Sequence, residues 1–361
     1  MARIAYVDHS YHRKTCSTAF LVDILQRYGH AVDLFWDEAW KGGDPVNFDQ
    51  VESYDIVIMF QSVCPTDKLY FRKIHPNVIH IPMLDQFGLY MGPWSNVSPY
   101  WEIFHGSKII SFSCMVHAMA TSLGIKSFPV RYYQNPARFE RATSSKRHGL
   151  NGFFWLRNAD HVAWPMIRSL ICDTKFDTLH IHVAPDPYTK SPVLPTADEI
   201  KKYNITTSTW FDNKEDFLAV LQKANVFFAA RLEEGIGQSF LEAMSRGQCV
   251  VAPDNGTMNE YILHGVNGLL YKASSPRPLD FSRVNCLGEQ AYQTVVSGYS
   301  VWESLQQELV DFILTPSEEF YRNAYCHPLI WNSAPCVTSL LTFRQKLKNS
   351  RIARKIKWLL R

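Results

Sequence analysis

The sequence has no long run of apolar residues. None of its apolar stretches reaches the roughly 18 uninterrupted residues that a membrane-spanning helix requires. Apolar residues make up 46% of the 361-residue chain and charged residues 20%, which is the composition of a soluble globular protein. The length suits two domains of ordinary size. We therefore expect a cytoplasmic protein without a transmembrane helix.

The paired motifs of metal and redox sites are also absent. The eight cysteines are scattered and none forms a C-x-x-C pair, so we expect reduced thiols in a cytoplasmic protein. The sequence contains no zinc-ligand spacing and no D-x-D motif. No G-x-G-x-x-G follows the first predicted strand, which argues against an NAD-dependent dehydrogenase.

Acidic residues are absent from one segment. Residues 344–361 contain eight basic side chains and no acidic one, whereas the whole chain has a net charge of +3. The rest of the chain is therefore acidic, and nucleic-acid binding is not expected. In a helix formed by this segment, Ile352, Ile356, Leu359 and Leu360 fall on one face. This pattern favours peripheral binding to the inner face of an anionic membrane. A helix packed on the body of the protein is the alternative.

Short apolar, β-prone runs alternate with helical patterns in residues 1–136. Strands are predicted at residues 3–7, 31–36, 55–60, 78–83, 108–112 and 128–133, and helices at 17–28 and around 114–123. Ser17 is the predicted cap of the first helix. Because strands and helices alternate, we expect an α/β domain built on a doubly wound parallel sheet.

A polar stretch at residues 137–150 is the predicted linker to a second domain, residues 151–314. Strands are predicted there at residues 152–156, 177–184, 205–210, 225–230 and 248–252. Residues 301–314 have the apolar spacing of an amphipathic helix. The second domain is therefore also predicted to be α/β.

Residues 226–252 are the most informative part of the chain, with the order strand, Gly-containing loop, helix, strand. Gly235 and Gly237 allow close backbone approach, and the N–H groups at the start of the helix favour a phosphate. Glu234 precedes the helix, and Glu242 lies roughly 6–8 Å along its axis. Because ligands of such units sit beyond the carboxyl ends of the strands, the two carboxylates suit the two ends of a nucleoside diphosphate sugar. A plain turn with two surface glutamates is the alternative.

This segment resembles the E-x7-E signature of the family-4 retaining glycosyltransferases. The resemblance is carried by Glu234-Gly235-Ile236-Gly237, Leu241-Glu242-Ala243-Met244, Gly247, Val250-Val251-Ala252, Gly256, Glu260 and Asn267-Gly268-Leu269-Leu270, and it continues weakly at Trp302-Glu303. It implies the GT-B fold, in which two Rossmann-like domains face each other across a cleft, and it implies that residues 315–343 return to the first domain. It further implies metal-independent transfer of a hexose-type sugar from a nucleoside diphosphate to a hydroxyl, with retained configuration.

The resemblance also assigns roles to residues of the second domain. Glu234 would contact hydroxyls of the donor sugar, and Glu242 would contact the ribose. The leaving diphosphate would be stabilised by backbone amides of Gly235, Ile236, Gly237 and Gln238 and by the side chains of Arg157 and Arg231. Glu234 and Arg157 are therefore the predicted catalytic residues. Five positions after this arginine the family has a lysine, where the chain has Val162. Arg231, or more weakly Lys190, is the predicted substitute.

The resemblance places the acceptor, a glycan or lipid-linked glycan, against loops of the first domain. The candidate acceptor-side residues are His9, His12, Asp85 and His117. Tyr90, Trp94, Tyr100 and Trp101 are aromatic residues that either stack on sugars or simply pack. The family often has two glycines after the first strand, and this chain has none there, which suggests an altered acceptor or phosphate contact.

Two alternatives to a glycosyltransferase of cell-surface polysaccharide biosynthesis stay open. A sugar-nucleotide epimerase on the same fold would need acid and base groups in the cleft, which the motif does not show. A non-catalytic GT-B protein that binds glycan or assists a partner enzyme is consistent with the missing glycines and lysine. In the favoured interpretation, the nucleotide sugar is a co-substrate and no other cofactor is needed.

Overall fold

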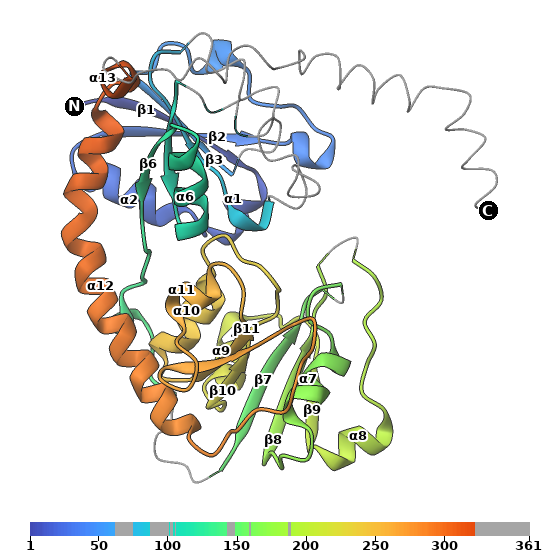
Figure 1. The fold of residues 1–361 in the computed structure, drawn as a ribbon. Coiled ribbons are helices and arrows are strands. Elements are labelled where there is room, and N and C mark those ends of the chain that lie inside the picture. Colours follow the sequence, from blue (N-terminus) through green and yellow to red (C-terminus); the bar gives the residue numbers. More distant parts are fainter. Residues whose placement is uncertain are drawn as a thin grey trace.

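A computed structural model describes most of the chain as two α/β domains with a long helix along one side (Figure 1). The described residues are 1–61, 75–86, 101, 104, 106–142, 149–158, 160–186 and 189–321. The predicted basic tail at 344–361, most of the segment 315–343, and Tyr90, Trp94 and Tyr100 lie outside them.

The first domain is built on a six-stranded parallel sheet with the order β2-β1-β3-β4-β5-β6. Its strands are β1 (Arg3–His9), β2 (Ala31–Asp37), β3 (Ile56–Phe60), β4 (Val78–Ile81), β5 (Lys108–Ser111) and β6 (Lys126–Pro129), and its helices are α1 (Tyr11–Thr15), α2 (Ala19–Arg27) and α6 (Cys114–Ser122). Every residue of β3 is buried. This is why the continuous apolar run predicted a strand covered on both faces.

The second domain has the same plan, with the strand order β12-β11-β10-β7-β8-β9 and parallel pairing throughout. Its strands are β7 (Asn151–Leu156), β8 (Thr178–Val183), β9 (Ile205–Ser208), β10 (Val226–Phe228), β11 (Cys249–Pro253) and β12 (Gly268–Tyr271), and its helices are α7 (Trp164–Ile171), α8 (Ala197–Lys202), α9 (Lys214–Leu221), α10 (Gln238–Ser245) and α11 (Met258–Tyr261). The sheets confirm the predicted pair of doubly wound domains.

The start of the first domain differs from the predicted single helix at 17–28. A short helix, α1, follows β1 directly, and α2 begins only at Ala19 with Thr18 as its cap residue. Cys16 separates the two helices with a φ of 53°, in the left-handed region. The predicted cap, Ser17, therefore lies in the connection between α1 and α2. The residues of α1 are mostly polar and show no helical spacing of apolar residues, so the sequence does not predict this helix.

The amphipathic helix predicted at 301–314 is much longer, because α12 spans Val284–Leu314. Its earlier half continues the buried stripe through Leu287, Ala291 and Val295 at four-residue spacing. Exposed polar residues lie between these positions and weaken the apolar spacing, so the sequence predicts only the later half of the helix.

α12 packs on both domains, running from the second to the first along one side of the molecule (Figure 1). Near its middle, the ring of Trp302 lies 5.5 Å from that of Tyr132, and near its end Phe312 lies 5.2 Å from Phe128 of β6. The return to the first domain, expected from residue 315 onward, is thus already made by α12. The described residues continue only through the short helix α13 (Ser317–Tyr321).

A buried lysine secures the end of α12 on the first domain. The Nζ of Lys108, at the start of β5, donates hydrogen bonds of 2.8 and 2.9 Å to the carbonyls of Phe312 and Ile313, and a third to Thr315. These carbonyls belong to the last turn, where helices lack internal donors. Burial lowers the pKa of Lys108 to about 7, so the contact combines favourable hydrogen bonds with a desolvation cost.

Two glycines allow α12 to approach the second domain and the chain that joins the domains. A Cβ at position 288 would lie 2.2 Å from the carbonyl oxygen of Gly247, and one at position 298 would lie 2.3 Å from the ring of Tyr133. Backbone meets backbone at the first of these contacts, so no side-chain movement relieves it. The docking of α12 therefore depends on the missing side chain of Gly288.

Replacing Gly288 with alanine is expected to destabilise the protein by about 1–3 kcal/mol, the usual cost of overpacking, although alanine favours helices. The measurement is the free energy of unfolding in urea. Ser300→Ala, at an exposed position of the same helix, is the matched control and should stay within about 0.5 kcal/mol of wild type. A Gly288→Ala protein as stable as the control would show that α12 docks less closely than described.

Candidate active site between the two domains

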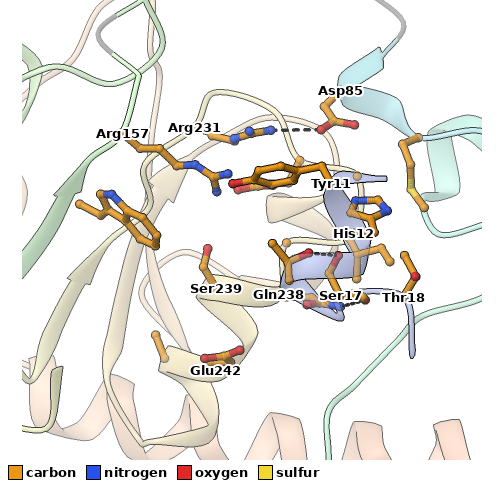
Figure 2. A pocket seen from close by; sticks show the side chains of 18 of the residues that line it. Tyr11, His12, Ser17, Thr18, Asp85, Arg157, Arg231, Gln238, Ser239 and Glu242 are labelled. Carbon is orange, nitrogen blue, oxygen red and sulfur yellow. Dashed lines mark hydrogen bonds and ion pairs between the residues drawn. The ribbon is translucent and has the colours of Figure 1, made fainter. Parts of the chain in front are cut away.

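A cavity of about 400 Å³ lies between the two domains. The first domain contributes residues that follow β1, β3 and β4, and the second contributes residues that follow β7 and β10 together with α10. Both sheets therefore present the carboxyl ends of their strands to the cavity, which is where ligands bind in open α/β sheets. Figure 2 shows the side chains of the two domains facing each other across this space.

The loop between β10 and α10 is shaped by two glycines. Gly237 precedes α10 with a φ of 78°, and a Cβ there would lie 1.9 Å from the ring of Phe240. Gly235 lies against the first domain, because its Cβ would be 2.9 Å from the sulfur of Met83. Both glycines line the cavity with Ile236 and Gln238. The backbone N–H groups at the start of α10 are thus next to the cavity, in a position that suits an anion.

Glu234 and Glu242 both line the cavity. Burial raises the pKa of Glu234 to about 7, although Arg231 and Arg157 oppose the rise. Burial also raises the pKa of Glu242, against the effects of Arg246 and of a hydrogen bond from Gln134. A carboxyl group that titrates near neutrality either accepts or donates a hydrogen bond, which suits binding to sugar hydroxyls.

Two arginines and one aspartate of the second domain form a charge network with Asp85 of the first domain. The Nε of Arg157 donates to both carboxylate oxygens of Asp186, at 2.8 and 2.9 Å. Arg231 pairs with Asp85 of the first domain at 3.3 Å and with Asp186 at 3.5 Å. Burial raises the pKa of Asp85, and the guanidinium of Arg231 opposes this rise. The Arg231–Asp85 pair crosses from one domain to the other (Figure 2).

The predicted substitutes for the missing family lysine differ in position. Val162 is fully buried in the core of the second domain. Lys190 pairs with Asp160 at 2.7 Å, both side chains are exposed, and neither is a lining residue of the cavity. Arg231 does line it, so of the two candidates it is the one near the predicted diphosphate position.

Three of the four candidate acceptor-side residues, His9, His12 and Asp85, line the cavity. Burial and the neighbouring His12 lower the pKa of His9 to about 4. His117 lies on α6, bonded to the hydroxyl of Ser127 at 3.1 Å, and is not a lining residue. Among the aromatic candidates, Trp101 is fully buried and its ring packs 5.5 Å from that of Phe104, so it packs rather than faces the cavity.

Several lining residues escaped the sequence-based prediction. They include Tyr11, Ser17, Thr18, Gln61, Trp155, Ser239 and Arg246. Tyr11 and Gln61 immediately follow the ends of β1 and β3 or lie within two residues of them, so a systematic search of strand ends would have found them. For Ser17, the sequence pattern predicts only a helix cap. Its carbonyl instead accepts a hydrogen bond from the side chain of Gln238, across the domain interface (Figure 2).

Glu260, part of the segment that carries the family resemblance, connects the domains outside the cavity lining. It lies on α11 and accepts hydrogen bonds from the hydroxyl of Ser113 at 2.7 Å and from the N–H of Cys114 at 2.8 Å. These groups form the start of α6 in the first domain, where a carboxylate is favourable. Glu260 therefore acts as an interdomain helix cap.

Comparison with known proteins identifies the fold. Residues 195–280 match the family model described as Glycosyl transferases group 1. Sucrose-phosphate synthase from Thermosynechococcus elongatus superposes with a TM-score of 0.65 at 13% identity, covering 86% of this chain and 98% of that chain. HepE from Anabaena, solved in complex with UDP and glucose, gives a TM-score of 0.60 at 13% identity, covering 86% of this chain and 100% of that chain. The fold is GT-B.

The GT-B assignment confirms the predicted fold class. A third similar structure is the lipopolysaccharide outer core galactosyltransferase WaaB in its apo form, with a TM-score of 0.58 at 14% identity, covering 86% of this chain and 99% of that chain. At sequence identities this low, the similarity to these structures shows only that the fold is shared. A sequence comparison with curated proteins gave no match. None of the helices in the described ranges combines the length and apolarity that membrane crossing requires.

The raised pKa of Glu234 predicts a specific pH dependence of stability. Because the pKa is about 7 in the folded protein and 4.5 is the ordinary value, the unfolded chain ionises first as the pH rises. This group should therefore lower stability progressively from about pH 4.5 to 7 and make no further change above that range. Relative to Glu234→Gln, which does not titrate there, the thermal midpoint of the wild type should fall across this window.

The matched control for this prediction is Glu308→Gln, at an exposed position of α12, whose midpoint relative to wild type should be nearly independent of pH. Other titrating groups remain in all three proteins and largely cancel in the differences. A constant difference between wild type and Glu234→Gln from pH 4.5 to 8 would contradict the raised pKa.

Proposed function

We propose that the protein is a retaining glycosyltransferase that moves a sugar from a nucleoside diphosphate to a hydroxyl of a glycan or lipid-linked glycan. The observation that carries this proposal is the composition of one wall of the cavity. Arg157, Arg231, the start of α10, Glu234 and Glu242 lie together there. Positive groups for a diphosphate are thus combined with carboxylates for the hydroxyls of two sugars. The group 1 match at residues 195–280 supports a glycosyl donor on this wall.

The proteins of similar fold support the two substrate classes. HepE was solved with UDP and glucose and also with UDP-glucose, which supports a nucleoside diphosphate hexose as the donor of this chain. WaaB is described as a lipopolysaccharide outer core galactosyltransferase, which supports a glycan attached to a lipid as the acceptor. We assign the donor to the second domain and the acceptor to the side of His9, His12 and Asp85.

In the proposed reaction, the bond between the anomeric carbon and the diphosphate oxygen breaks, and its electron pair leaves with the diphosphate. The guanidiniums of Arg157 and Arg231 and the amides from Gly235 to Gln238 stabilise the charge that develops there. Asp186 binds the Nε of Arg157, whose guanidinium is directed into the cavity (Figure 2). These fixed positive groups take the place of a metal ion in our proposal.

The acceptor oxygen then bonds to the anomeric carbon on the face that the diphosphate leaves, so the configuration is retained. Glu234 binds hydroxyls of the donor sugar. Because its pKa is about 7, its carboxyl group either accepts or donates these hydrogen bonds. Glu242, farther along α10, binds the ribose. Each carboxylate thus serves one end of the donor, unlike a glycosidase pair that flanks a single bond.

Two experiments in sequence test this function. Calorimetry with UDP-, GDP- and ADP-sugars identifies the donor, and NMR of the product formed with lipid extracts gives the anomeric configuration. A glycoside of retained configuration is the expected product. Conversion of the donor sugar without any acceptor would identify an epimerase. Binding without turnover of the donor, even with acceptor present, would identify a non-catalytic protein.

The two glutamates are expected to fail differently when replaced. Glu242→Ala should raise the Kd of the nucleotide sugar about 10- to 100-fold, which corresponds to the loss of hydrogen bonds to a charged group. Glu234→Ala should lower kcat by about 100-fold or more in a protein that still folds. Calorimetry, initial rates and thermal unfolding measure these effects. Glu308→Ala on the exposed face of α12 is the control, and unchanged sugar transfer in both variants would refute the assignment.

We also propose that the basic segment 344–361 attaches the enzyme to the inner face of the cytoplasmic membrane, near a lipid-linked acceptor. Its eight basic residues each contribute about 1 kcal/mol near an anionic surface. Deleting residues 344–361 should shift the protein from the membrane fraction to the soluble fraction, as measured by sedimentation with anionic vesicles. A deletion variant that sediments like the full chain would show that this segment packs on the protein instead.

A further inference from the structure

Asp8 and His12 form a hydrogen-bonded pair at the end of β1, on the acceptor side of the cavity. Asp8 is fully buried. Its carboxylate accepts three hydrogen bonds: from the N–H of His9 at 2.8 Å, from the hydroxyl of Thr18 at 2.7 Å and from Nδ1 of His12 at 2.8 Å. The carboxylate is therefore held in one orientation by the start of α2 and by its own strand, and His12 is oriented by it.

The contact with Asp8 defines what the rest of the imidazole can do. Because Nδ1 faces a carboxylate, it carries the proton, so Nε2 of the neutral ring is an acceptor. His12 lines the cavity, and its side chain keeps 13% of its surface exposed. Within the part of the chain that the structure describes, the side chain of His12 is hydrogen-bonded to Asp8, through Nδ1. Nε2 is thus the polar atom of His12 left to meet a substrate.

Two aromatic neighbours restrict the ring further. The ring of His9 lies 3.9 Å from that of His12, and the ring of Phe60 at the end of β3 meets it edge-on at 5.9 Å. Figure 2 shows His12 on the first-domain side of the cavity, with Arg157, Ser239 and Glu242 on the other. The imidazole is therefore fixed by a carboxylate behind it and by rings beside it, as a group that acts on a bound substrate requires.

We propose that His12 is the proton acceptor for the acceptor hydroxyl and that Asp8 is its positioning residue. This inference rests on the proposed function and extends it. In the step, the hydroxyl gives its proton to Nε2 of His12, and its oxygen forms the bond to the anomeric carbon. The bond from that carbon to the diphosphate breaks, with the electron pair leaving on the diphosphate. Asp8 stabilises the imidazolium that results, as in other carboxylate–histidine pairs.

A cation site is the competing interpretation of the same side chains. Asp8, His9 and His12 each place one ligand atom within 4.8 Å of the others. However, both oxygens of Asp8 already accept hydrogen bonds, and Nδ1 of His12 is engaged in one of them. The geometry therefore favours proton transfer, and metal dependence becomes an outcome of the test.

The test uses the full chain and the nucleotide sugar that calorimetry identifies. His12→Gln should keep the Kd of that donor within about twofold of wild type and lower turnover, to acceptor or to water, by about 100-fold or more, which is the usual contribution of a general base. Asp8→Asn should lower turnover by about tenfold or more through misorientation of the ring, also at unchanged donor Kd. In His12→Gly, added imidazole should restore part of the turnover, because it supplies the missing base.

The control is His264→Gln, which changes an exposed histidine of the second domain and should leave turnover unchanged. Turnover by His12→Gln within threefold of wild type would refute the proposed role of His12 and Asp8. So would turnover of His12→Gly that imidazole does not raise, or wild-type turnover that EDTA abolishes. If the nucleotide sugars do not bind the wild type, the proposed function fails first, so the two failures are distinguishable.

Discussion

The docking of α12 on both domains is the constraint on which the rest of the structure depends. The helix meets the second domain through the bare backbone of Gly288, and Lys108 of the first domain binds its last carbonyls. Between these two points, Trp302 packs on the chain that joins the domains. A rigid helix anchored at both ends fixes the separation of the two sheets. Their loops consequently face each other at a distance where side chains of both reach one ligand.

A second constraint is the concentration of charged groups at the interface between the two domains. Arg157, Arg231, Asp186 and Glu234 of the second domain lie close together, and Arg231 pairs with Asp85 of the first domain. Burial raises the pKa of Glu234 and that of Asp85, and the guanidinium of Arg231 opposes both rises. The aspartates orient both arginines, so the proposed reaction would need little reorganisation of these groups when a phosphate binds. In the proposed function, these cationic groups bind the diphosphate although the position of the expected lysine is occupied by the buried Val162.

The sequence predicted those parts of the molecule that produce a periodic or apolar signal. The described strands other than β12 are predicted because parallel sheets bury continuous apolar runs. The place of Glu234, Gly237 and Glu242 beside the cavity is predicted because ligands sit beyond the carboxyl ends of strands in such loop-to-helix units. Side-chain direction gave no such signal. His117 was expected at the acceptor but bonds to Ser127, while Tyr11 lies on a helix too short and polar to show a period. Contacts between domains, such as Gln238 with Ser17, depend on tertiary packing that local patterns do not contain.

Gly235 and Met83 touch across the domain interface, since a single added carbon at position 235 would lie 2.9 Å from the sulfur. Within the separation that α12 imposes, this contact brings the two loops close together, because the adaptable side chain of Met83 meets a residue without a side chain. Larger side chains at these two positions would push the two domains apart and separate the proposed donor site from the proposed acceptor site.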